Sequence, residues 1–366
     1  MSRLILLGNP ETKRAVYLKK GAEKAGAEVE VLDWREFPHN FEEIYFQEEE
    51  IFLKIDPPLW NSCCLEELDR LVLKYEGNLD YLAASVRSKG ITFLNHPQGI
   101  KELLDKRGCK RRLKKAGIPV TEELETESTS AILQRECEYP LTEQLLDTME
   151  RQKIFQVFIK PNHGSGAAGV MAFRYEPRKG QTALYTCAAE QTTTGSLVNT
   201  KRLRRFTDRR KVCSIVEGLL KTDCIVERWY AKAENKGFSY DLRAVVQDGK
   251  IDFMLARLSA GPITNLQLNN HPLRAEELGL SSAVKNQVEQ VCRQAAACWP
   301  SLRSVGVDIL LERRSLRPRV IEMNGQGDLI YQDIYGENKI YCRQAEMMKR
   351  WQQGEKQQTG RGGSTD

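Results

Sequence analysis

Two apolar runs near the C-terminal end of the chain carry three oxygen-bearing side chains. Asp308 lies in the first run, and Glu322 and Asn324 end the second. Because side chains two residues apart on a strand point to the same face, we predict that Glu322 and Asn324 face one way. The polar turn at 313–319 lets the two strands pair, which brings Asp308 to the same place. Three oxygen donors suit Mg²⁺, whereas the alternative is three polar strand-end residues that are hydrated by water.

A lysine followed by a loop of small residues forms a second set. Lys160 ends the apolar run 157–160. The loop after it contains Gly164, Ser165, Gly166 and Gly169. This is not a Walker A loop, because the lysine precedes the glycines and no helix follows. Backbone N–H groups of such a loop can form a nest for a phosphate, and the lysine adds a positive charge. The alternative is an ordinary glycine-rich hairpin turn.

The elements that must position these residues follow two patterns. Short apolar runs alternate with helical stretches over 1–95, which predicts a small parallel α/β domain. Beyond it, antiparallel pairs are predicted from 157–160 with 170–175, from 243–246 with 253–258, and from 305–311 with 320–323. Helices are predicted over 100–116 and 285–298, and the segment 39–75 gives no clear assignment.

Composition is typical of a soluble globular protein, with 41% hydrophobic and 29% charged residues, which disfavours a membrane or fibrous class. No apolar run of about 18 residues occurs that would span a membrane. The ten cysteines lack C-x-x-C spacing, which favours reduced thiols in the cytoplasm over a disulfide framework or a zinc site. The net charge of +5 is too mild to indicate a nucleic-acid partner. The polar segment 351–366 is predicted to be disordered.

Taken in order over about residues 95–345, these motifs resemble the ATP-grasp superfamily, closest to its RimK-like and glutathione synthetase-like ligases. The resemblance implies an α/β (α+β) protein with the ATP-grasp fold, in which two α+β subdomains clasp ATP. The implied domains are a pre-ATP-grasp α/β domain at 1–95, a part at 96–230 with a lid subdomain at about 150–230, a C-terminal subdomain at 231–350, and the tail at 351–366.

The same resemblance implies roles for single residues. Lys106 and Lys160 are expected to bind ATP phosphates, and Gly164, Ser165, Gly166 and Gly169 to form the lid loop. Glu227 and Trp229 lie in a segment similar to the hinge strand that reads adenine and ribose. Asp241 and Arg243 match the D-x-R strand, Arg257 the second arginine that faces the reacting phosphate, and Asn265 the N-L pair that follows. Asp308, Glu322 and Asn324 match the metal ligands.

The implied activity is ADP-forming ligation of a carboxylate to an amine or thiol, with ATP and two Mg²⁺ ions (or Mn²⁺ in their place) as cofactors. The implied partners are a small-molecule or peptide carboxylate and an amine or thiol acceptor, with no membrane and no nucleic acid. Dimers are common among the resembled ligases. Ile263 stands where the glutathione synthetase-like pattern has an arginine, and Asn269-Asn270 where it has a glycine pair. These departures leave both substrates open and motivate an alternative, a catalytically silent ATP-binding regulatory or scaffold protein.

Two further features admit two interpretations each. The basic stretch Lys201–Lys211 is either a solvated face of the lid or a contact for RNA or an acidic peptide. An RNA-binding protein is therefore the third hypothesis, and the near-neutral balance of the whole chain argues against it. His163 in the glycine loop is either a phosphate contact or base, or a structural hydrogen-bonding group.

Overall fold

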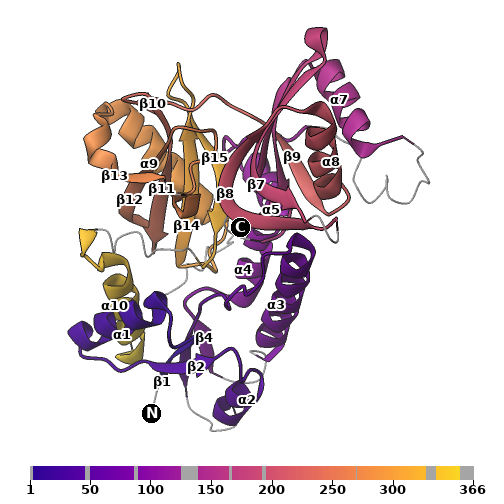
Figure 1. Ribbon diagram of the computed structural model, residues 1–366. Helices are drawn as coiled ribbons and strands as arrows, with labels where there is room; N and C mark the ends of the chain where they lie inside the picture. The colour runs from indigo at the N-terminus through magenta and orange to yellow at the C-terminus, as the bar shows by residue number, and fades with distance from the viewer. Residues whose placement is uncertain are drawn as a thin grey trace, which may run out of the picture.

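Three β-sheets make up the fold in the computed structural model, which describes residues 3–45, 50–85, 90–124, 139–164, 167–191, 195–268, 270–326 and 335–354 (Figure 1). Ser165, Gly166 and Asn269 and most of the predicted tail lie outside these ranges. No helix in the described ranges is long and apolar enough to cross a lipid bilayer.

The N-terminal unit is a parallel sheet in the order β2-β1-β3-β4. Its elements are β1 (Arg3–Gly8), α1 (Lys13–Ala25), β2 (Glu30–Asp33), α2 (His39–Tyr45), β3 (Ile51–Ile55), α3 (Leu65–Ser85) and β4 (Ile91–Phe93). β3 is buried along its whole length and β1 at all but its first residue, as expected for near-continuous apolar runs in a parallel sheet. The predicted parallel α/β unit is confirmed, and the segment 39–75 contributes α2, β3 and the first half of α3.

The last described helix, α10 (Lys339–Gln352), returns to this N-terminal unit and packs along α1 (Figure 1). The helices approach so closely that a Cβ atom on Gly21 would lie 2.9 Å from the carbonyl oxygen of Tyr341. Trp351 is buried, with its ring centroid 5.2 Å from that of Phe52. The start of the tail at 351 is therefore corrected: the buried indole ring keeps Trp351 and Gln352 in the helix.

Two helices replace the single basic helix predicted over 100–116. α4 (Pro97–Leu104) ends and α5 (Lys106–Lys115) begins at Asp105. The Asp105 side chain accepts a hydrogen bond from the backbone N–H of Gly108 at 3.0 Å and so caps α5. The break was missed because both helices carry the same apolar periodicity, while the capping aspartate lies inside it. Its consequence is that Lys106 is the first residue of α5.

The second sheet is antiparallel throughout, in the order β8-β7-β6-β5-β9. Its elements are α7 (Leu141–Gln152), β5 (Gln156–Pro161), β6 (Met171–Glu176), β7 (Gln181–Glu190), β8 (Leu197–Phe206), α8 (Arg209–Leu220) and β9 (Cys224–Arg228). α7 and α8 lie together on the outer side of this sheet (Figure 1). The hairpin predicted after Lys160 is present, since β5 pairs with β6 from Gln156 to Ile159.

The third sheet is also antiparallel, with the order β13-β12-β11-β14-β15 and β10 beside β11. Its elements are β10 (Glu234–Asn235), β11 (Phe238–Gln247), β12 (Lys250–Ser259), β13 (His271–Arg274), α9 (Ser282–Ala297), β14 (Ser304–Leu311) and β15 (Pro318–Asn324). α9 covers the side that faces away from the second sheet (Figure 1). All three antiparallel pairs predicted from the sequence form: β5 with β6, β11 with β12, and β14 with β15.

Candidate functional site

A cavity of about 410 Å³ takes its lining residues from the second and third sheets and from helices and loops of the N-terminal unit. This volume is within the usual range for a small-molecule site, roughly 300–1,000 Å³. Eleven of the residues selected from the sequence line it: Lys106, Lys160, Gly164, Glu227, Asp241, Arg243, Arg257, Asn265, Asp308, Glu322 and Asn324. Gly169 and Trp229 do not, and Ser165 and Gly166 lie outside the described residues.

The proposed metal ligands meet on the paired strands β14 and β15. Asp308 is directly opposite Glu322 in the ladder, and Asn324 is two residues farther along the same strand. Burial and the charge of Asp308 raise the pKa of Glu322, as expected for two neighbouring carboxyl groups without a cation between them. The side-chain nitrogen of Asn324 is buried without a hydrogen-bond partner among the described residues.

This set of oxygen donors fits a hard cation whose remaining ligands are oxygens of a bound substrate. No group of three or more His, Cys, Asp or Glu side chains among the described residues is placed to hold a metal. The site has two carboxylates and one amide, and Mg²⁺ is commonly held by one or two carboxylates while substrate phosphates supply other oxygens.

Two buried arginines neutralise Asp308. Arg243 donates from Nη2 to Asp308 Oδ2 at 3.0 Å and also from Nε to the other oxygen, and Arg257 Nη2 lies 3.1 Å from Oδ2. Burial alone would raise the pKa of Asp308, but the two guanidinium groups outweigh it and hold the pKa well below its usual range. Asp308 is therefore charged, and the arginines are fixed by it at the wall of the cavity.

Asp241 organises a second part of the wall. It accepts a hydrogen bond from Arg257 Nε at 2.7 Å and another from the hydroxyl of Thr264, and Lys232 Nζ lies 3.4 Å away. Lys232 also donates to Thr264 at 2.7 Å. Burial would raise the pKa of Asp241, but Arg257 and Lys232 hold it below its usual value. Asp241 thus fixes cationic groups that face the cavity.

Asn270 holds the adjoining loop in place. Its side-chain nitrogen donates to the carbonyl oxygens of Ile263 and Asn265, both at 2.8 Å. Ile263 is buried, and it lines the cavity together with Asn265. Two of the residues that depart from the glutathione synthetase-like pattern are therefore structural parts of this wall.

Two lysines share one buried carboxylate on β9. Lys160 Nζ lies 3.0 Å from Glu227 Oε2, and Lys110 Nζ lies 3.2 Å from Oε1. Thr121 donates to the same carboxylate at 2.9 Å. Burial opposes the charge on Lys160, but Glu227 and Glu322 outweigh it and raise the pKa of Lys160. Glu227 is consequently occupied by protein groups and positions Lys160 at the cavity wall.

The two lysines on Glu227 are expected to respond differently to substitution. Lys160 lines the cavity, whereas Lys110 lies on α5 behind it. Lys110→Met should lower the free energy of unfolding by roughly 3–5 kcal/mol, because a buried carboxylate loses one of its partners. Lys160→Met should in addition raise the dissociation constant for ATP at least about tenfold. Urea unfolding and nucleotide titration of both variants test this difference, and equal losses of ATP affinity would contradict it.

Lys110 and Lys232 are site residues that the sequence reasoning missed. Lys110 stands four residues after Lys106 on α5, a spacing that places both on one helix face and could have revealed it. Lys232 lies two residues beyond the hinge segment and carried no comparable signal, because only the folded chain brings it to Asp241.

Lys106 is directed toward the glycine loop. Its ammonium group donates to the carbonyl oxygen of Gly164 at 2.9 Å and to that of Asn162 at 3.3 Å. Gly164 has φ +102°, a left-handed conformation that favours glycine. Burial lowers the pKa of Lys106. The first lysine and the glycine loop therefore lie together at the cavity, as the resemblance implied.

Trp229 lies away from the cavity. Its ring packs against Phe158 with centroids 5.4 Å apart and lies under the guanidinium of Arg174. Its backbone N–H donates to Gln156 at 2.9 Å. The assignment of Trp229 as a nucleotide-contacting residue is therefore corrected, because both its ring and its N–H are used within the second sheet; Tyr230 lines the cavity instead.

His163 joins the glycine loop to the N-terminal unit. Its Nδ1 lies 2.6 Å from Glu76 on α3, and its Nε2 lies 3.6 Å from Asp223. The hydrogen bond with Glu76 raises the pKa of His163 and outweighs the effect of burial, while Asp105 and Asp223 add to the rise. Glu76 is thus the hydrogen-bonding partner that a structural role of His163 requires.

This pair predicts a pH-dependent contribution to stability. Because the folded-state pKa of His163 is raised above the ordinary 6.5, its contribution is fully present below pH 6.5 and is lost as pH rises through the folded pKa. The difference in unfolding free energy between the wild type and His163→Gln should therefore be largest in mildly acidic buffer and shrink toward alkaline pH. Denaturant titrations across this range check it, and a gap that widens with pH would contradict it.

The basic stretch Lys201–Lys211 lies on β8 and the first turn of α8, and none of its described side chains lines the cavity. Lys211 pairs with Glu190, and Arg209 Nη2 lies 3.4 Å from Glu143. The stretch therefore lies on the edge strand β8 and on α8, and its described side chains do not line the cavity.

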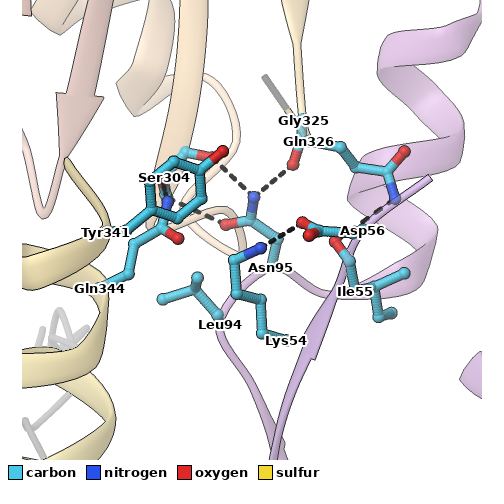
Figure 2. Close-up of a pocket in the computed structure, with 10 residues that line it drawn as sticks. All are labelled: Lys54, Ile55, Asp56, Leu94, Asn95, Ser304, Gly325, Gln326, Tyr341 and Gln344. Carbon is cyan, nitrogen blue, oxygen red and sulfur yellow. Dashed lines mark hydrogen bonds and ion pairs between the residues drawn. The ribbon is translucent and has the colours of Figure 1, made fainter. Parts of the chain in front are cut away.

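Asn95 connects the N-terminal unit to the strands that carry the acids. Its amide nitrogen donates to the carbonyl oxygens of Ser304, at 2.6 Å, and Gly325, and its oxygen accepts from the N–H of Ser304 at 2.9 Å (Figure 2). Ser304 begins β14, and Gly325 directly follows Asn324. One buried side chain thereby holds the start of β14 beside the end of β15, where the candidate ligands meet.

No family model matches the chain, and no curated protein matches it. Solved structures do: the ATP-grasp ligase PsnB complexed with minimal precursor, Mg and ADP has a TM-score of 0.55 at 14% identity, covering 95% of this chain and 98% of that one. A Chryseobacterium gregarium RiPP-associated ATP-grasp ligase, in complex with ADP and a leader and core peptide, has a TM-score of 0.57 at 12% identity. The match covers 96% of this chain and 97% of that one. D-Alanine–D-alanine ligase from Bacillus anthracis, complexed with ATP, has a TM-score of 0.53 at 14% identity. The match covers 97% of this chain and 99% of that one. The fold predicted from the motifs is confirmed: this chain has the ATP-grasp fold.

Proposed function

We propose that the protein is an ATP-dependent ligase that activates a carboxylate as an acyl phosphate, releases ADP, and joins the acyl group to an amine or thiol. The observation that carries this proposal is the single cavity that collects two lysines, two arginines and the set Asp308, Glu322 and Asn324 from separate sheets. Support comes from the similar structures, which are ligases complexed with Mg and ADP or with ATP.

ATP would bind with its base near the hinge and its phosphates near the lysines. The hinge end of the cavity is lined by Arg228 and Tyr230 and by the apolar side chains Leu310, Ile321 and Met323. Lys106 and Lys160 lie on the glycine-loop side. Apolar walls suit a flat base, and compact ammonium charges suit phosphate oxygens.

Asp308, Glu322 and Asn324 would hold Mg²⁺, which neutralises phosphate charge during transfer. In the first step, a carboxylate oxygen of the substrate attacks the γ-phosphorus, and the bond to the β,γ-bridging oxygen breaks so that ADP leaves with the electron pair. Arg243 and Arg257 would steady the charge on the transferred group. Losing such a donor costs about 3 kcal/mol, or roughly a hundredfold in rate.

In the second step, the nitrogen or sulfur of the acceptor attacks the acyl carbon. The carbon–oxygen bond to phosphate breaks, phosphate departs, and the acceptor loses a proton. Lys106 and the glycine loop would keep water away from the acyl phosphate, since they lie against one another at the cavity. A peptide is a candidate carboxylate or acceptor, because the PsnB and Chryseobacterium gregarium structures are described with peptide ligands.

The test is product analysis with the purified chain, ATP and Mg²⁺. Pools of carboxylic acids and acidic peptides are supplied with and without amines or thiols. ADP and phosphate should form in equal amounts, and hydroxylamine should trap the acyl phosphate as a hydroxamate. Formation of AMP and pyrophosphate would overturn the proposed chemistry, and tight ATP binding without turnover in any pool would favour a regulatory role.

A further inference from the structure

The cavity continues past the phosphate-binding residues into a part walled by the N-terminal unit. This part, the N-terminal lobe, is lined by Arg14, Pro57, Trp60, Asp69, Val72 and Gln326. Arg14 comes from α1, which follows β1, and Pro57 and Trp60 come from the loop that follows β3. β1 and β3 are neighbours, and the chain turns toward opposite edges of the sheet after them. Their carboxyl ends therefore form a topological switch point, where open parallel sheets bind ligands.

Arg14 is a cation of this lobe that lacks a protein counter-ion. It makes no hydrogen bond or ion pair with any residue in the described part of the chain. Asp56 is instead taken by Lys54, and both are buried. Burial lowers the pKa of Lys54, and the charge of Arg14 adds to that effect. A half-buried guanidinium that lines the cavity and pairs with none of the described carboxylates suits an anionic ligand, because Arg binds carboxylate in a bidentate manner.

Part of the lobe's wall is apolar and is packed against buried residues of the N-terminal unit. The Trp60 ring packs edge-on against buried Tyr75 with centroids 5.8 Å apart. Gln326 donates to the carbonyl oxygen of Ile55 at 3.5 Å (Figure 2). It also donates to the Tyr75 hydroxyl, so the segment after Asn324 is tied to this wall. Val72 adds an aliphatic surface from α3. The lobe therefore combines aromatic and aliphatic surface with the cation Arg14 and the acid Asp69 in the cavity that also holds Arg243 and Arg257.

We propose that the carboxylate substrate is a doubly anionic acid: its reacting carboxylate lies beside Arg243 and Arg257, and its second anionic group binds Arg14 in the N-terminal lobe. An aliphatic dicarboxylate or an acidic amino-acid residue has this chemistry. The proposal rests on the proposed function for the identity of the reacting end. A monocarboxylate with an apolar tail is the competing occupant, since the same wall would accept it.

The experiment measures binding, so it does not depend on turnover. The full chain, saturated with Mg²⁺ and a non-hydrolysable ATP analogue, is titrated with three matched pairs: succinate and butyrate, glutarate and valerate, adipate and caproate. At least one dicarboxylate should bind about tenfold or more tightly than its monocarboxylate partner. Arg14→Met should remove that preference, Arg14→Lys should retain part of it, and the exposed Arg70→Met on α3 should leave it unchanged.

Equal binding of each matched pair, no binding of any dicarboxylate, or an Arg14→Met variant that keeps the preference would each overturn the proposal. Nucleotide affinity of the variants is measured in parallel and should be unaltered, which shows that they are folded. Failure of the ligase function has a different signature: dicarboxylates would bind in an Arg14-dependent way, yet no acid would yield ADP or a hydroxamate.

Discussion

Glu322→Gln is expected to lower ADP formation by about 10²–10³-fold while leaving the metal-free protein at least as stable as the wild type. Burial and Asp308 raise the pKa of Glu322, so its ionised form is unfavourable in the folded protein without a cation. At neutral pH this group therefore opposes folding, and an amide of the same shape removes that cost. The substitution should separate function from stability, because it removes the negative charge of one proposed ligand and also relieves a repulsion.

Thermal and urea unfolding with and without Mg²⁺ and ATP provide the measurement. At a ligand concentration of one hundred times the dissociation constant, binding stabilises the wild type by about 2.7 kcal/mol. Mg²⁺ and ATP should stabilise the Glu322→Gln variant clearly less than they stabilise the wild type. Glu289→Gln, at an exposed position on α9, serves as the matched control and should behave like the wild type. Unreduced ADP formation by Glu322→Gln, or a marked loss of metal-free stability, would contradict the metal-site assignment.

Arg257→Met is expected to lower the free energy of unfolding by roughly 3–5 kcal/mol. Arg257 is 4% exposed and contacts both Asp241, at 2.7 Å, and Asp308, at 3.1 Å. Its removal withdraws positive charge from two buried carboxylates at once. Because both pKa values are held low by cations, the lost stability should be largest above the ordinary pKa of these groups and should shrink as the pH falls.

Urea unfolding at pH 7 and at acidic pH tests this expectation. Arg293→Met on α9 removes an exposed arginine from an i,i+4 pair and should change stability by no more than about 0.5 kcal/mol. Arg257→Lys should recover only part of the loss, since an ammonium group cannot reproduce a planar guanidinium shared between two acids. If Arg257→Met loses no more unfolding free energy than the Arg293→Met control, the contacts of Arg257 with Asp241 and Asp308 do not stabilise this wall.

The strand pairs around the site were predictable because local sequence specifies them. Alternation places Glu322 and Asn324 on one face, and the short turn after β14 brings Asp308 opposite Glu322. The ATP-grasp fold followed from the order of several such short motifs. The glycine loop was predictable as well, since Gly164 adopts a conformation that favours glycine. What the motifs could not supply was the partner of each charge, as Lys110 and Lys232 show.

By itself the sequence determined the hairpins, the parallel N-terminal sheet and the residue types that could meet phosphate and metal, because these follow from periodicity, turns and ligand chemistry over a few residues. The tertiary structure alone decided that α10 packs on α1 at Gly21, that Asn95 joins β14 to β15, and that Trp229 packs within its sheet. It also decided that Arg14, far from every motif in the chain, lines the same cavity as Arg243. Such contacts depend on long-range packing, which no local pattern encodes.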